Sequence, residues 1–233
     1  MSSLKFKLSV ALMVICTASY VAYLEVQASE ESDEQIGFSA VWPGSDEQLL
    51  QINRACAQSP TRDYAECFIA QMPGFGASEE AVSFTRDYAK HNHGTIAILR
   101  GFHPMDAVDL GYVYFPAAKE FRQGWLLLNG MPSVINVDDL NRLPQSAMEK
   151  DPGWTTLRSR YPQMKFFFDG SERKLDTSPE MQTLPDGGQR FIIEYPLRNG
   201  CGACALLGHA IFSFDFDAAG ELVTVRFVSV TPS

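Results

Sequence analysis

The stretch HAIFSFDFDAAGELVTVRFVSV, residues 209–230, decides the fold class. Apolar and polar side chains alternate on both sides of the turn residues Asp217–Gly220, and a period of two is typical of a β-strand with one buried face. In the first half, Phe212, Phe214 and Phe216 share a face. The stretch therefore predicts two antiparallel strands joined by a short turn.

The strand after the turn covers Leu222–Val230 and alternates in the same way. It places three apolar residues on one side, Val223, Val225 and Phe227. A further apolar run, Phe191–Leu197, precedes both strands. Short connections between alternating strands predict a three-stranded β-meander with one buried face at the end of the chain.

Helix signals come earlier in the chain. Ser45 and Gln48 have the spacing of a capping box that starts the first helix, Thr61 is positioned to cap the second, and Ser78 caps a third. Strands are expected at Thr95–Phe102, Leu110–Phe115, Trp125–Leu128 and Val134–Val137, short helices near Pro144 and after Asp151, an apolar run at Lys165–Phe168, and a surface loop at Ser171–Gly188.

The order of these elements, helices first and then strands, indicates an α+β fold. We predict that residues 45–233 form a single α+β domain, in which N-terminal helices pack on a largely antiparallel sheet ending in the three-stranded β-meander.

The N-terminus has the three-part pattern of a secretory signal peptide. Lys5 and Lys7 precede an apolar stretch, Leu8–Leu24, and Val26-Gln27-Ala28 matches a small-residue cleavage pattern. We expect residues 1–28 to be removed, which places the protein outside the cytoplasm, in the periplasm or the extracellular space. An uncleaved leader that anchors the chain to the membrane is the alternative.

The net charge of the chain limits the classes of molecule that it is expected to bind. The chain carries a net charge of −9 and has no basic stripe, so nucleic-acid binding is not expected. Residues 29–44 include an acidic run, Glu30 to Glu34, and we expect this segment to be disordered. The sequence indicates no cofactor, and the expected partner is a protein or a small-molecule ligand of unknown identity.

Four cysteines lie behind the leader, and Cys16 lies within it. Cys56, Cys67, Cys201 and Cys204 are an even number behind an export signal, which predicts two disulfides. Four cysteines allow three pairings. The sequential one, Cys56–Cys67 and Cys201–Cys204, is favoured by spacing, because the first pair would lie at similar heights on two antiparallel helices.

The C-G-A-C motif at 201–204 carries the only nameable chemistry, thiol–disulfide exchange. In a redox protein Cys201 would be the attacking thiolate and Cys204 the resolving thiol, with Arg198 or His209 lowering the thiol pKa. The motif resembles that of thioredoxins in these four residues only, because a thioredoxin motif opens a long helix, whereas the 29 residues after Cys204 have the pattern of strands. A structural disulfide on a turn is the leading interpretation.

Two further hypotheses concern loops. The segment Arg198–Cys204 is similar to the cysteine-bounded loop of periplasmic lysozyme inhibitors, which would imply inhibition of a secreted enzyme. His91, His93 and His103 are weak candidates for a metal site. No set of residues in the sequence identifies a catalytic site, so the leading prediction is an exported, disulfide-stabilised binding or accessory protein of the cell envelope.

Overall fold

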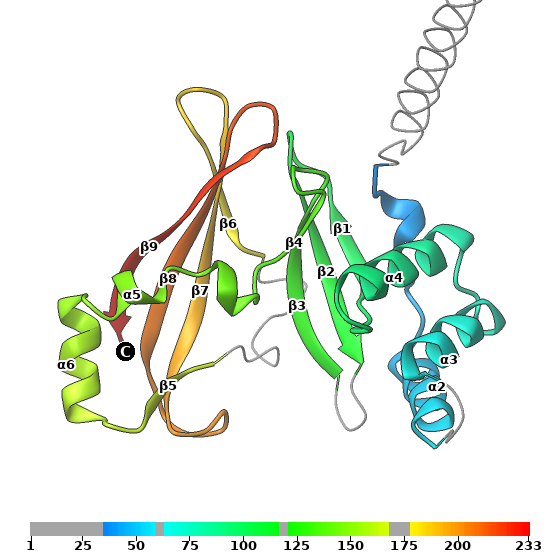
Figure 1. Ribbon diagram of the computed structural model, residues 1–233, viewed down its shortest axis with the longest axis horizontal. Coiled ribbons are helices and arrows are strands. Elements are labelled where there is room, and N and C mark those ends of the chain that lie inside the picture. The colour runs from blue at the N-terminus through cyan, green and yellow to red at the C-terminus, as the bar shows by residue number, and fades with distance from the viewer. Residues whose placement is uncertain (1–34, 59–62, 117–120, 168–177) are drawn as a thin grey trace, which may run out of the picture. The chain divides into compact units, whose positions relative to one another are not determined.

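A computed structural model of the protein describes residues 35–58, 63–116, 121–167 and 178–233 (Figure 1). The expected signal peptide lies outside these residues. The helices are η1 (Phe38–Ala40), α2 (Asp46–Ala57), α3 (Tyr64–Gln71), η2 (Met72–Phe75), α4 (Glu79–His91), η3 (Leu140–Arg142), α5 (Gln145–Met148) and α6 (Pro152–Arg160). The strands are β1 (Ile98–His103), β2 (Asp109–Pro116), β3 (Phe121–Leu128), β4 (Val134–Asn136), β5 (Met164–Phe166), β6 (Glu180–Thr183), β7 (Gln189–Asn199), β8 (Leu206–Phe216) and β9 (Leu222–Pro232).

The helices start where their caps predict, with one exception. Ser45 and Gln48 form the expected capping box on α2, and Ser78 Oγ accepts a hydrogen bond from the Ala81 N–H at the start of α4. The second helix is capped by Asp63, whose carboxylate accepts from two main-chain N–H groups, so the assignment of Thr61 as its cap is wrong. An ionised carboxylate at the N-terminus also complements the helix dipole.

The strands form two antiparallel sheets. One has the order β1-β2-β3-β4, and the other has the order β5-β7-β8-β9, with β6 paired to the same edge of β7 as β5. The fold is therefore α+β, and β7, β8 and β9 form the predicted C-terminal meander. The strand β6 lies inside the stretch 171–188 that the sequence predicts as a loop, so that prediction is wrong for Glu180–Thr183.

The two sheets share one hydrophobic core. Trp125 and Leu127 of β3 lie in the same buried cluster as Phe191, Phe212 and Phe214 of β7 and β8. Helix α4 packs on the four-stranded sheet through a separate cluster that includes its Phe84 and Tyr88 with Val113 and Leu126. A third cluster joins the α2–α3 hairpin to the start of β1. Figure 1 shows these helices beside the four-stranded sheet.

Two bulges change which residues of β9 face the core. Phe216 pairs with Leu222 and Asp215 pairs with Thr224, so Val223 has no partner in the register. Val223 is 65 % exposed, and Leu222 packs on the core with Val225 and Phe227. The prediction that Val223 shares the inward face is wrong, because a bulge inserts one residue and reverses the alternation.

Residues 36–44, which the sequence predicts to be disordered, are part of the folded unit. The compact unit begins at Ile36. The Ile36 N–H donates to Asn129 Oδ1, and Asn129 Nδ2 donates to the Ile36 carbonyl, at 2.8 Å each. Trp42 is buried, and its main-chain N–H donates to the Leu99 carbonyl at 2.9 Å. The expectation of disorder over 29–44 is therefore wrong for residues 36–44, and residues 29–34 lie outside the described part of the chain.

Candidate functional site

The C-G-A-C segment forms a disulfide-closed turn between β7 and β8. Cys201 and Cys204 are bonded, with their Cα atoms 5.1 Å apart, and the Cys204 N–H donates to the Cys201 carbonyl at 3.0 Å. Gly200 has a φ of +90°, which lets the chain leave the strand and enter this turn. Cys201 is exposed and Cys204 is half-buried, so a thiol in solution can reach the bond.

Of the two residues expected to lower the thiol pKa, Arg198 binds the main chain of the turn and His209 is paired within the sheet. The Arg198 guanidinium donates from Nη1 to the Cys204 carbonyl at 2.9 Å, which holds the turn closed. His209 lies in β8 opposite Pro196 of β7 and Thr231 of β9. No helix begins at Cys201, since the turn leads into β8, so the helix N-terminus that lowers a thiol pKa in many redox proteins is missing here.

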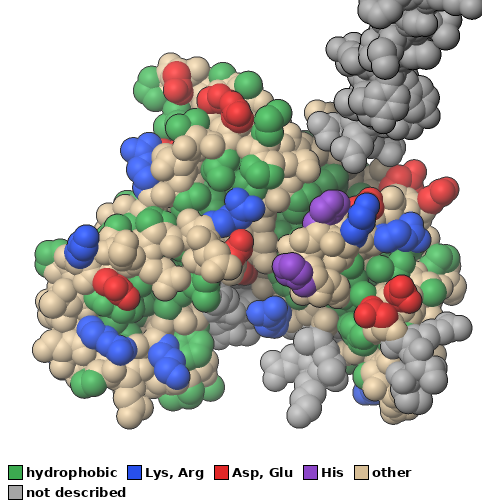
Figure 2. Space-filling view, in the orientation of Figure 1, with side chains coloured by type: hydrophobic (Ala, Val, Ile, Leu, Met, Phe, Trp, Pro, Cys, Tyr) green, Lys and Arg blue, Asp and Glu red, His purple; other side chains and the backbone are tan. Residues whose placement is uncertain are grey.

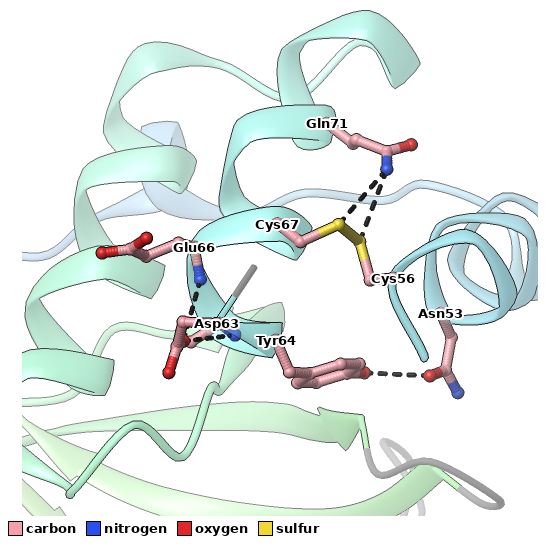
Figure 3. Close-up of a disulfide and its surroundings, with 8 residues drawn as sticks. Asn53, Cys56, Asp63, Tyr64, Glu66, Cys67 and Gln71 are labelled. Carbon is pink, nitrogen blue, oxygen red and sulfur yellow. Dashed lines mark hydrogen bonds between the residues drawn. A yellow bond between two sulfur atoms is a disulfide. The ribbon is translucent and has the colours of Figure 1, made fainter. Parts of the chain in front are cut away.

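The other disulfide is a buried link between helices (Figure 3). Cys56 of α2 and Cys67 of α3 are 3 % and 4 % exposed, and their Cα atoms are 5.6 Å apart. Gln71 Nε2 donates to both sulfur atoms, at 3.4 and 3.6 Å. A disulfide this deeply buried stabilises the packing of the two helices, and the predicted pairing of these two cysteines is confirmed.

The Tyr64 hydroxyl makes a polar contact beside this disulfide. It donates to Asn53 Oδ1 at 3.0 Å and thereby joins the same two helices (Figure 3). Burial raises the pKa of Tyr64 to about 12, so the hydroxyl remains a donor at physiological pH.

The three histidine candidates lie on different elements. His91 ends α4 and contacts the Asp87 carbonyl through Nδ1 at 2.8 Å, and His93 follows in the turn with a φ of +52°. His103 ends β1 and its ring lies 6.1 Å from that of Trp125. Within the described residues, no group of three or more His, Cys, Asp or Glu side chains converges in a way that would hold a metal ion.

A groove of about 560 Å³ lies between α5, α6 and β5. Its lining residues are Leu140, Gln145, Glu149, Trp154, Arg158, Met164, Lys165 and Phe166. A volume of this size is within the range of small-molecule sites, which combine apolar walls with a few polar groups. We call this site the α5–α6–β5 groove.

Local structure fixes the position of each wall of the groove. Asp151 caps α6 by accepting from the Gly153 and Trp154 N–H groups at 2.7 and 3.2 Å, which sets the start of the helix that carries Trp154 and Arg158. The other wall, β5, is paired with the end of β7, where Lys165 lies opposite Arg198. The disulfide turn is thus the direct continuation of the strand that holds β5.

The charge around the groove is opposite to that of the whole chain. Residues 139–166 contain five Lys and Arg and three Asp and Glu, a local net charge of +2 in a protein of −9. Figure 2 shows Lys and Arg side chains around hydrophobic surface over α5, α6 and β5. Positive potential at an apolar groove attracts organic anions.

The local sequence pattern does not reveal this groove. Basic residues interleaved with aromatic ones between Trp154 and Phe166, in an otherwise acidic chain, were the available signal. That signal does not show that α6 and β5 converge, which depends on the pairing of β5 with β7.

A buried ion pair lies on the face of the second sheet that is turned away from the core. Asp215 of β8 is 2 % exposed and accepts from Arg190 Nε and Nη2, both at 2.7 Å, and from Arg226 Nη2. Burial alone raises the pKa of Asp215, but hydrogen bonds from Arg190, Arg226 and Ser213 outweigh it and lower this pKa below the ordinary value. The cluster ties three strands together.

Comparison of the chain with protein-family models, curated proteins and solved structures finds no significant match. Every helix in the described part of the chain is too short or too polar to cross a lipid bilayer.

Proposed function

We propose that this protein is exported and acts as a binding protein, with the α5–α6–β5 groove as its ligand site. The groove is the observation that carries the proposal, because it combines a suitable volume with apolar walls and polar groups. The role is non-enzymatic, since the lining side chains supply binding surface and charge but no paired nucleophile and base.

The two disulfides support export. Disulfides persist in oxidising compartments and are rare in the cytosol. One of them is deeply buried and stabilises the helical hairpin, and the other closes an exposed turn. We propose that residues 1–28 direct the chain across the membrane and are then removed.

Export is tested by fractionating cells and blocking free thiols before lysis. The expected result is a 205-residue chain, 28 residues shorter than the full sequence, in the exported fraction with all four remaining cysteines protected. Free thiols in a cytoplasmic, full-length chain would contradict the proposal.

Ligand binding is tested through Trp154. The chain has three tryptophans, of which Trp42 and Trp125 are each 2 % exposed, whereas Trp154 lines the groove. A small organic ligand in the groove should change the Trp154 emission, and the variant Trp154→Phe should lose that change. A signal that survives this substitution would place the ligand elsewhere.

Thiol–disulfide exchange at Cys201–Cys204 is a second candidate function. The exposure of Cys201 favours it, because an exposed disulfide is open to attack by a thiolate. Reduced by an external dithiol, Cys201 would attack a substrate disulfide, and Cys204 would then displace the substrate and restore the bond. The test is whether Cys201→Ser abolishes exchange with a small disulfide, and no exchange by the native chain would remove this candidate.

A further inference from the structure

We propose that the ligand of the α5–α6–β5 groove is an organic anion, a single carboxylate or similar group on an apolar body. This inference rests on the proposed function and names the class of molecule that the groove takes. It follows from the presence of two cationic side chains and several apolar ones in the same lining.

Two cations in the lining can bind an anion. Arg158 of α6 donates from Nη1 to the Met164 carbonyl of β5, which fixes the guanidinium at the junction of the two walls. Its remaining N–H groups are donors of the kind that bind carboxylates. Lys165 lines the same groove, and its ammonium has no ion-pair partner within the described residues.

Aromatic and aliphatic side chains provide the apolar surface of the groove. Phe166 stacks on Tyr195 of the core, with ring centroids 5.0 Å apart and an interplanar angle of 26°, so this wall is rigid. Leu140 is 40 % exposed, and Trp154 is half-buried. A ligand that covers these side chains removes apolar surface from water, which favours binding.

Glu149, the residue that follows α5, limits the number of negative charges on the ligand. It lines the groove, is exposed, and makes no ion pair within the described part of the chain. It disfavours a second anionic group by like-charge repulsion. The groove therefore prefers a monoanion to a dianion of the same size.

The experiment is calorimetric titration of the full chain with matched pairs of probes. One pair is 4-phenylbutyrate and its uncharged amide, and the other is octanoate and octanamide. The acid should bind about tenfold more tightly than its amide within a pair, the effect of one charge-assisted hydrogen bond. Comparison of the phenyl and alkyl pairs shows whether the body is aromatic or an acyl chain.

Two variants distinguish the effect of a cation in the groove from the effect of the net charge of the protein. Lys165→Gln and Arg160→Gln change the net charge equally, but Arg160 lies over the Tyr161 ring and does not line the groove. The first should weaken binding of the acids by about tenfold, and the second should leave it unchanged. Glu149→Gln should strengthen binding by about two- to threefold.

The outcomes distinguish the two proposals. If acids and amides bind the groove equally, or if Lys165→Gln and Arg160→Gln act alike, the anion inference is wrong and the binding function stands. If no acid or amide binds, both proposals fail. Thermal unfolding of each variant shows whether a loss of binding reflects a loss of folding.

Discussion

The side-chain amide of Gln189 pairs with the main chain of Val108 in the way that a neighbouring strand would. Gln189 Oε1 accepts from the Val108 N–H at 2.7 Å, and Nε2 donates to the Val108 carbonyl at 3.1 Å. The same oxygen accepts from the Ala107 N–H at 2.9 Å. Gln189 is fully buried at the start of β7, so this contact joins the two sheets at the segment that leads into β2.

Replacing Gln189 by Leu should destabilise the protein strongly. The substitution leaves two N–H groups and a carbonyl without partners at a buried site, which costs about 3 kcal/mol. Urea unfolding measures the loss. Gln182→Leu on exposed β6 is the matched control and should change the free energy of unfolding by less than about 0.5 kcal/mol. Equal effects of the two substitutions would show that Gln189 does not link the sheets.

Replacing Asp215 by Asn should destabilise the fold at neutral pH by about 2 kcal/mol, because Arg190 and Arg226 lose a buried carboxylate. The folded-state pKa of Asp215 lies below its ordinary value. Its contribution is therefore fully present above the ordinary pKa of about 4 and is lost as the pH falls through the lower, folded-state pKa.

The difference between native and Asp215→Asn proteins should thus shrink in unfolding experiments below about pH 4. Glu194→Gln, on an exposed position of β7, is the control. A difference that stays constant down to pH 2 would rule out the carboxylate as its source.

The two disulfides should open in a fixed order under mild reduction. Cys201 is exposed, whereas Cys56 and Cys67 are both buried, so a thiolate reaches the turn first. Thiol trapping and mass spectrometry during titration with dithiothreitol should detect free Cys201 and Cys204 while Cys56–Cys67 remains oxidised. Simultaneous opening would indicate that the helical hairpin unfolds as readily as the turn.

Removal of the two disulfides should lower the free energy of unfolding by different amounts. The loop closed by Cys56 and Cys67 has a sequence separation of 11, against 3 for the turn. Because each disulfide restricts the unfolded chain, the helical pair should stabilise the fold by about 3 kcal/mol and the turn pair by about 2 kcal/mol. Paired serine substitutions compared by urea unfolding measure this. We expect the larger loss for the helical pair, and a larger loss for the turn would point to a role of Cys201–Cys204 in holding β5.

Much of the fold could be predicted because its signals are local. The capping residues Ser45, Ser78 and Asp151 identified three helix starts, and strict alternation identified β8. The division into two sheets could not be predicted, since alternation shows that a strand has a buried face but not which strand lies opposite. The bulge at Val223 was missed because an inserted residue leaves no mark in the alternation itself.

The candidate site was harder to predict for the same reason. The pairing Cys201–Cys204 is favoured by spacing, and the structure confirms it on a turn that the positive φ of Gly200 permits. The groove depends on β5 returning to the end of β7, which puts Lys165 and Trp154 in one lining. Tertiary pairing of this kind is not encoded in the local pattern of either segment.

The most direct test of the binding function is a protein-observed NMR titration of the native chain with 4-phenylbutyrate. The account predicts chemical-shift changes that cluster at Glu149, the Trp154 indole, Lys165 and their neighbours in the groove. Shifts that cluster instead at the Cys201–Cys204 turn, or no shifts with either 4-phenylbutyrate or octanoate at millimolar concentration, would contradict it.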